Sequence, residues 1–205
     1  MPRRPTRWEI VEQDGYMLAR QAAFRRAADA ITAAFIKAPE VRAVTLFGSV
    51  ARPLKRNVPR FQPFRAFGIE ILHECKDVDL AVWIDRLDTL AAFNRARSRA
   101  LGELFTGGRP GVAHHQADIF LFEPQTDRYL GRLCCFGQCP KGKSDCLTPG
   151  CGRAPFLKQH EEFALYPDAL APDRAVPLFD RATGLSRRAA DLDAGVAGEG
   201  GARPA

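Results

Sequence analysis

The sequence predicts an α/β (α+β) protein with a small mixed sheet flanked by helices. Apolar residues recur at helical spacing over about residues 8–38. Short apolar runs with β-branched residues at 41–47, 78–84 and 117–122 indicate strands. Because a second helical pattern separates the last two runs, helices and strands alternate along the chain.

The first helix carries one apolar stripe. Its members, at spacings of three, four and seven, are Met17, Phe24, Ala28, Ile31 and Phe35. Pro39 ends the helix and Gly48 ends the strand that follows it. The segment 53–67 contains three prolines and several basic residues, which predicts an irregular inserted loop held down by Phe61, Phe64 and Phe67.

The second half of the chain is less regular. Asp88 is the expected N-cap of a helix with Leu90, Phe93 and Leu104 on its apolar side. A short helix is expected around 155–163, and disorder from about residue 190.

Three segments are therefore expected: a core over 8–128, a cysteine-rich segment over 129–165 and a C-terminal extension over 166–205.

Composition narrows the function classes. The 205 residues carry a formal net charge of +6, which favours phosphate-bearing partners without choosing among nucleotide, RNA and DNA. No run approaches the ~18 apolar residues of a membrane span. Acidic residues interrupt what would have to be a signal peptide, so a cytoplasmic protein without membrane contact is expected.

Three carboxylates are the main candidate site. Because side chains alternate along a strand, Asp77 and Asp79 share one face while Val78 and Leu80 face the other way. Asp118 opens the third strand, and if that strand is adjacent all three carboxylates converge. Carboxylates with substrate phosphates are the ligands that Mg²⁺ prefers, and three of them can hold two ions.

A phosphate site is expected next to these carboxylates. Gly48 would let the backbone approach phosphates closely, and Ser49 would offer a hydroxyl and an N–H at the start of a following helix. The Gly48-Ser49 pair alone is also typical of an ordinary turn, and the pair Asp77 and Asp79 alone is also typical of a solvated strand edge. Their order along the chain favours the functional interpretation.

The pattern resembles the DNA polymerase beta-type nucleotidyltransferase superfamily. Its small members have an apolar strand, Gly-Ser, Ala-Arg, Asp-x-Asp and a later lone Asp. Here these are Gly48-Ser49, Ala51-Arg52, Asp77, Asp79 and Asp118. Pro53 replaces a common glycine, Lys76 replaces a small polar residue, and the gap from Ser49 to Asp77 is long.

The resemblance implies transfer of a nucleoside monophosphate from a nucleoside triphosphate to an acceptor, with Mg²⁺ or Mn²⁺. Asp77 and Asp79 would be metal ligands, and Asp118 a third ligand or base. Gly48, Ser49 and Arg52 would bind the nucleotide. The acceptor is unidentified: a small molecule, a protein or an RNA.

Five of the six cysteines fall between residues 134 and 151, which in a cytosolic protein favours metal binding. We expect one structural Zn²⁺ held by Cys135, Cys139, Cys146 and Cys151. Cys134 could replace Cys135, His160 could replace one cysteine, and disulfides or buried thiols are the alternative. Cys75 stands apart and is expected to be a buried thiol, while His114 and His115 are expected to be turn residues.

A second function class stays open. The chain could be a non-catalytic module with a nucleotidyltransferase-like core, an antitoxin or scaffold that binds nucleic acid or protein. The basic insert and the cysteine segment suit this alternative, whereas three mutually repelling carboxylates favour the enzyme.

Overall fold

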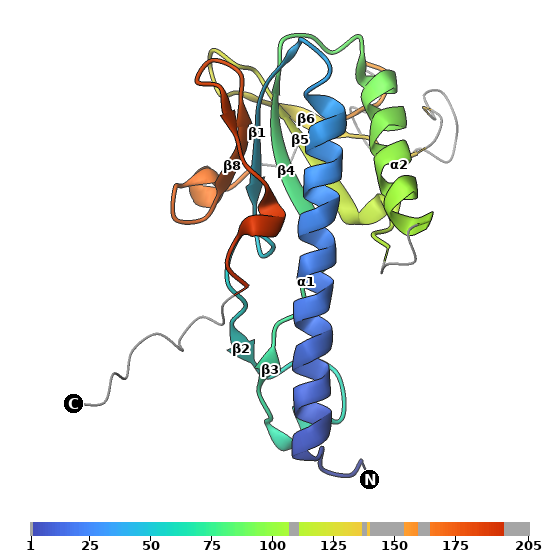
Figure 1. Ribbon diagram of the computed structural model, residues 1–205, viewed down its shortest axis with the longest axis vertical. Helices are drawn as coiled ribbons and strands as arrows, with labels where there is room; N and C mark the ends of the chain where they lie inside the picture. Colours follow the sequence, from blue (N-terminus) through green and yellow to red (C-terminus); the bar gives the residue numbers. More distant parts are fainter. Residues whose placement is uncertain (1, 107–110, 137–138, 140–153, 160–164, 195–205) are drawn as a thin grey trace, which may run out of the picture.

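A seven-stranded mixed sheet forms the centre of the protein (Figure 1). The computed structural model describes residues 2–106, 111–136, 139, 154–159 and 165–194. The sheet order is β7-β6-β5-β4-β1-β8-β9. The strands are β1 (Val41–Phe47), β4 (Val78–Ile84), β5 (Ala117–Phe122), β6 (Tyr129–Leu133), β7 (Leu157–Lys158), β8 (Val176–Asp180) and β9 (Leu185–Ser186).

One strand pair differs from the rest. β4 and β5 run parallel, whereas the other neighbouring strands of this sheet are antiparallel. A parallel pair needs a crossover, and α2 (Leu90–Thr106) supplies it. The strands expected at 41–47, 78–84 and 117–122 are confirmed, and the fold is a mixed α/β one.

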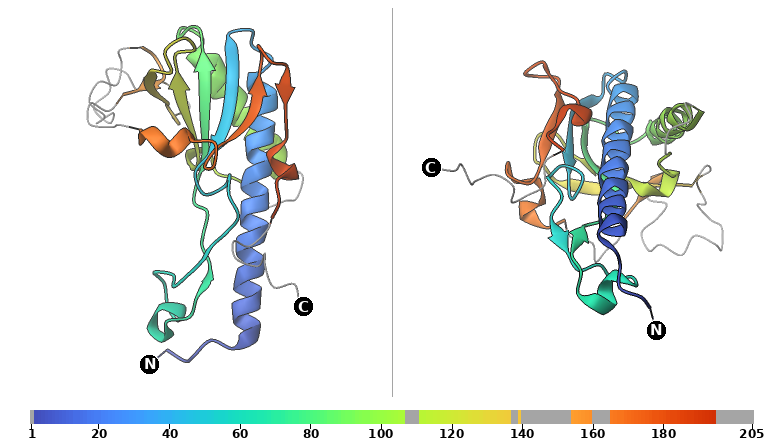
Figure 2. Two further views of the ribbon diagram at one scale, coloured as in Figure 1. Left: turned by 90° about the vertical axis from the view of Figure 1, so that its left-hand side faces the viewer. Right: turned by 60° about the horizontal axis from the view of Figure 1, so that its bottom comes forward.

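Both α-helices pack on the same face of the sheet, as Figure 2 shows. The helix α1 (Arg7–Phe35) begins with a capping box between Thr6 and Glu9 and ends at Ile36, before Pro39. Val78, Leu80 and other alternate residues of the sheet face these helices and form the main core. The opposite face, called here the open face, carries a second apolar cluster that includes Phe47 and Phe120.

The insert is more ordered than a loop. β2 (Arg56–Asn57) pairs with β3 (Ile71–Leu72), and η1 (Phe64–Phe67) lies between them. Buried Asp14 of α1 accepts a hydrogen bond from the Leu72 N–H at 2.7 Å. The same carboxylate forms an ion pair with Arg56 at 2.8 Å. Together with residues 7–20 of α1, residues 52–74 form an arm that extends away from the sheet (Figure 1). Of the three phenylalanines expected to hold the insert, only Phe64 is buried.

The sheet crosses all three expected segments, since β6, β7, β8 and β9 follow the first 128 residues. The prediction of a helix at 155–163 is wrong for residues 155–159, which form a turn and β7. The remaining residues of that range lie outside the described part of the chain. Asp88 is not the residue before α2, and its carboxylate pairs with Arg86 instead. The 3-10 helix η4 (Ala189–Asp191) docks on α1, where Asp29 accepts from the Ala189 N–H. Residues 195–205, expected to be disordered, lie outside the described residues.

Candidate functional site

The open face brings two of the predicted carboxylates side by side. Asp79 of β4 is the register partner of Asp118 of β5, and Phe47 is the partner of Asp79 on the other side. Asp77 comes just before β4, two residues from Asp79. Their neighbours Val78 and Leu80 are fully buried toward the helices. The alternation expected from the sequence therefore holds, and β4 and β5 are adjacent as the convergence requires.

The carboxylates repel one another. Burial, followed by the negative charges of Asp118 and Asp77, raises the pKa of Asp79 to about 7. Partial burial and the charge of Asp118 also raise the pKa of Asp77. Such a cluster is stabilised by any positive charge that reaches it, and hard divalent cations have the chemistry that suits its oxygen donors.

Arg132 of β6 supplies a positive charge in this structure. Its Nη1 lies 2.8 Å from Asp118 Oδ2, and its guanidinium lies over the Phe120 ring. Within the described ranges, no group of three or more His, Cys, Asp or Glu side chains is arranged to hold a metal ion. Metal binding by Asp77, Asp79 and Asp118 therefore stays a prediction. Sequence reasoning missed Arg132, because a single arginine in a short strand carries no signal of its partner.

Gly48 lies against the carboxylate of Asp79. Its φ of +75° favours glycine, and a Cβ placed there would collide with Asp79 Oδ2. The tight approach predicted for Gly48 thus involves the carboxylate itself. Residues 48–51 form a turn and no helix follows, so the helix N-terminus expected at Ser49 is wrong.

The turn after β1 is held by α1. Gln21 Nε2 donates to the Arg52 carbonyl at 2.7 Å, and buried Arg25 donates to the Val50 carbonyl at 3.1 Å. Arg52 is exposed, with its Nε 3.4 Å from the Gly48 carbonyl. The backbone of the turn is therefore fixed by side chains from the helix behind it, while the Arg52 side chain stays exposed at the turn.

The backbone of residues 134–136, where the cysteines begin, is also held by side chains from elsewhere in the fold. Buried Arg97 of α2 donates to the Cys134 carbonyl at 2.7 Å, His114 Nδ1 lies 2.8 Å from the Cys135 carbonyl, and Asn94 donates to the Phe136 carbonyl at 2.7 Å. His114 belongs to a 3-10 turn, η2 (His114–Gln116), and burial lowers its pKa.

The cysteines differ in accessibility. Cys75 is a buried thiol, as predicted, and burial raises its pKa. Cys134 is also buried, whereas Cys135 is exposed and Cys139 is partly exposed. Cys146, Cys151 and His160 lie outside the described residues, so the zinc site stays a prediction.

Comparison with known proteins gives no relative. No family model, curated protein or solved structure matches this chain. Among the described helices, none is both long and apolar enough to cross a membrane.

Proposed function

We propose that this protein is a metal-dependent nucleotidyltransferase that moves a nucleoside monophosphate from a nucleoside triphosphate to an acceptor. The supporting observation is the register pairing of Asp79 with Asp118 on parallel strands, with the Gly48 turn packed against Asp79. Burial and the charges of Asp118 and Asp77 raise the pKa of Asp79 to about 7, so a cation bound beside it would favour its ionised form.

The residues suit this chemistry. Asp77, Asp79 and Asp118 would hold Mg²⁺ or Mn²⁺, which would neutralise the triphosphate and polarise its α-phosphorus. Arg52 and the backbone of Gly48 and Ser49 would orient the phosphates. Asp118 would take the proton of the attacking hydroxyl, and Arg132 would hold that carboxylate in place beforehand.

The alternative, a non-catalytic nucleic-acid-binding module, is favoured by the surface of the arm. Lys55, Arg60 and Arg65 are exposed and have no ion-pair partner among the described residues. Large exposed apolar side chains accompany them, including Trp8 and Phe67. Basic and aromatic side chains together suit single-stranded nucleic acid.

Calorimetry with a non-hydrolysable nucleoside triphosphate separates these functions. The enzyme should bind the triphosphate more tightly with Mg²⁺ than with EDTA, and Asp77→Asn or Asp79→Asn should remove that difference. Asp85→Asn, a carboxylate just beyond the far end of β4 that pairs with Arg42, is the matched control. Equal Mg²⁺ dependence in wild type and the Asp79 variant would refute the assigned site.

A second assay addresses transfer itself. Incubation with nucleoside triphosphates labelled at the α-phosphate, in cell extract, should label an acceptor only when Asp77 and Asp79 are intact. An RNA that binds the arm with no label transfer would favour the alternative.

A further inference from the structure

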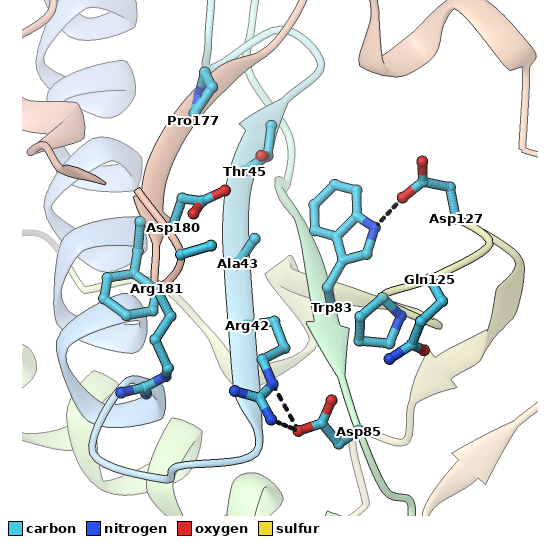
Figure 3. Close-up of a pocket in the computed structure, with 13 residues that line it drawn as sticks. Arg42, Ala43, Thr45, Trp83, Asp85, Gln125, Asp127, Pro177, Asp180 and Arg181 are labelled. Carbon is cyan, nitrogen blue, oxygen red and sulfur yellow. Dashed lines mark hydrogen bonds and ion pairs between the residues drawn. The ribbon is translucent and has the colours of Figure 1, made fainter. Parts of the chain in front are cut away.

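The open face also contains a groove that the carboxylates do not explain. Its cavity is about 680 Å³, within the range of small-molecule sites. Aromatic rings form its floor and apolar side chains its wall; its main lining residues are Trp83, Phe122, Tyr129, Leu170, Ala175 and Pro177. We call this the aromatic groove. It is adjacent to a second pocket that shares Thr45, Trp83, Asp127 and Pro177 with it (Figure 3).

The floor of the aromatic groove is held in place before any ligand binds. Trp83 stacks on Phe122 with ring centroids 5.2 Å apart, and Phe122 packs against Tyr129 at 5.6 Å. The Trp83 indole N–H donates to Asp127 Oδ1 at 2.6 Å, as Figure 3 shows. Rings fixed in this way offer a flat apolar surface at little entropic cost to a ligand.

One polar group in the groove is unused. Thr45 of β1 points into the shared part of the two pockets, where its side chain is labelled in Figure 3. The residue is 8% exposed, and its hydroxyl makes no hydrogen bond within the part of the chain that the structure describes. A hydroxyl that opens on the groove can donate to a ligand or accept from it.

The groove and the carboxylates share one sheet face. Asp79 and Trp83 lie four residues apart on β4, and their register partners Asp118 and Phe122 do so on β5. At about 3.3 Å per residue, the Asp79–Asp118 pair and the Trp83–Phe122 pair are roughly 13 Å apart along the strands. Phe120 lies between them on β5. A ligand of two or three fused rings would bring a hydroxyl toward the carboxylates if it lay along the strands, with its far end over Phe120.

The charges near the groove argue against a polyanion. Asp127 lies at the shared rim and Asp180 in the second pocket, where Arg42 is paired with Asp85 at 2.6 Å and Arg181 donates to backbone carbonyls. Neutral or cationic ligands fit these carboxylates better than a phosphate backbone.

We propose that the aromatic groove is the acceptor subsite, and that the acceptor is a small molecule with a flat, largely apolar ring system that carries a hydroxyl. This proposal rests on the proposed function. The acceptor hydroxyl oxygen bonds to the α-phosphorus of the nucleoside triphosphate. The bond from that phosphorus to the bridging oxygen breaks, pyrophosphate leaves with the electron pair, and the hydroxyl proton passes to Asp118.

The two tryptophans provide the test. Trp8 is 74% exposed on the arm, far along the chain from the groove, and Trp83 lines it. In protein labelled with 5-fluorotryptophan, Trp8→Phe assigns the two ¹⁹F resonances. Titration with 2-naphthol should shift the Trp83 resonance saturably and leave the Trp8 resonance in place. Cyclohexanol, which has the hydroxyl but no flat ring, should bind much more weakly.

Variants sharpen the test. Thr45→Val should weaken 2-naphthol binding by roughly three- to tenfold, the loss of one hydrogen bond. Ser186→Ala, which removes an exposed hydroxyl of β9 outside both pockets, is the control and should bind like wild type. A Trp83 resonance that 2-naphthol leaves unmoved, or that a short RNA moves instead, would overturn the proposal.

Calorimetry with nucleoside triphosphate on the same samples distinguishes the two failures. If Mg²⁺-dependent triphosphate binding is intact but 2-naphthol does not bind, the acceptor subsite is wrong and the nucleotide site stands. If 2-naphthol binds but the triphosphate does not, the proposed function fails, and with it the acceptor role.

Discussion

Replacement of Asp79 by Asn should change the pH dependence of folding in a defined direction. The pKa of Asp79 rises from 3.8 to about 7 on folding, about three pH units. Between these values the folded state holds a proton that the unfolded state has lost, so the free energy of unfolding falls as pH rises. At about 1.36 kcal/mol per unit, ionised Asp79 costs the native protein at most about 4 kcal/mol above pH 7.

The Asn variant removes this cost, although its amide must be buried without the ideal hydrogen bonds, at about 1–3 kcal/mol. The net expectation is a variant about 1–3 kcal/mol more stable than wild type near pH 8, with the advantage gone near pH 4. Urea unfolding in EDTA across this range measures it. Parallel stability curves for wild type and the Asp79 variant would refute the reasoning.

Three further outcomes are expected. Gly48→Ala should destabilise the fold by on the order of 1–3 kcal/mol because of its positive φ and the clash with Asp79, whereas Gly15→Ala, with nothing within 4 Å, should stabilise α1. Asp14→Ala should cost about 1.5–3 kcal/mol in urea unfolding and expose the Leu72 N–H to hydrogen exchange. Elemental analysis of protein purified without added metal should find one zinc per chain, and zinc-free protein with freely titrating thiols would exclude the site at 135–151.

The strands that the sequence predicted are those with a strong local signal. The runs at 41–47, 78–84 and 117–122 are apolar and buried on the helix face, and the first two are rich in β-branched residues, so apolar pattern and structure coincide. β8 could not be found this way. Its segment Val176–Asp180 includes Pro177 and only one fully buried residue, and it is a strand because it pairs with β1.

The sequence predicted which carboxylates form the candidate site, but it did not predict the side chains that surround them. Strand alternation placed Asp79 on the open face, and a parallel neighbour placed Asp118 beside it. The counter-charge of Arg132, the buried Arg97 and the free hydroxyl of Thr45 all depend on which elements lie side by side. Such long-range contacts leave no trace in local spacing. The helix expected at Ser49 is absent, and Pro53 lacks the N–H that would bond the Ser49 carbonyl in a helix.

The length of α1 has a consequence for cooperativity. At 29 residues the helix is about 44 Å long, so it belongs both to the sheet core and to the arm. Within the arm, the insert is held to α1 by buried contacts that include Leu54 and the Asp14 hydrogen bond, and we expect these to open before the central sheet does. Amide protons in the first turns of α1 should therefore exchange through a sub-global opening, at lower protection than those near Ile31. One continuous helix would then report on two separate unfolding units.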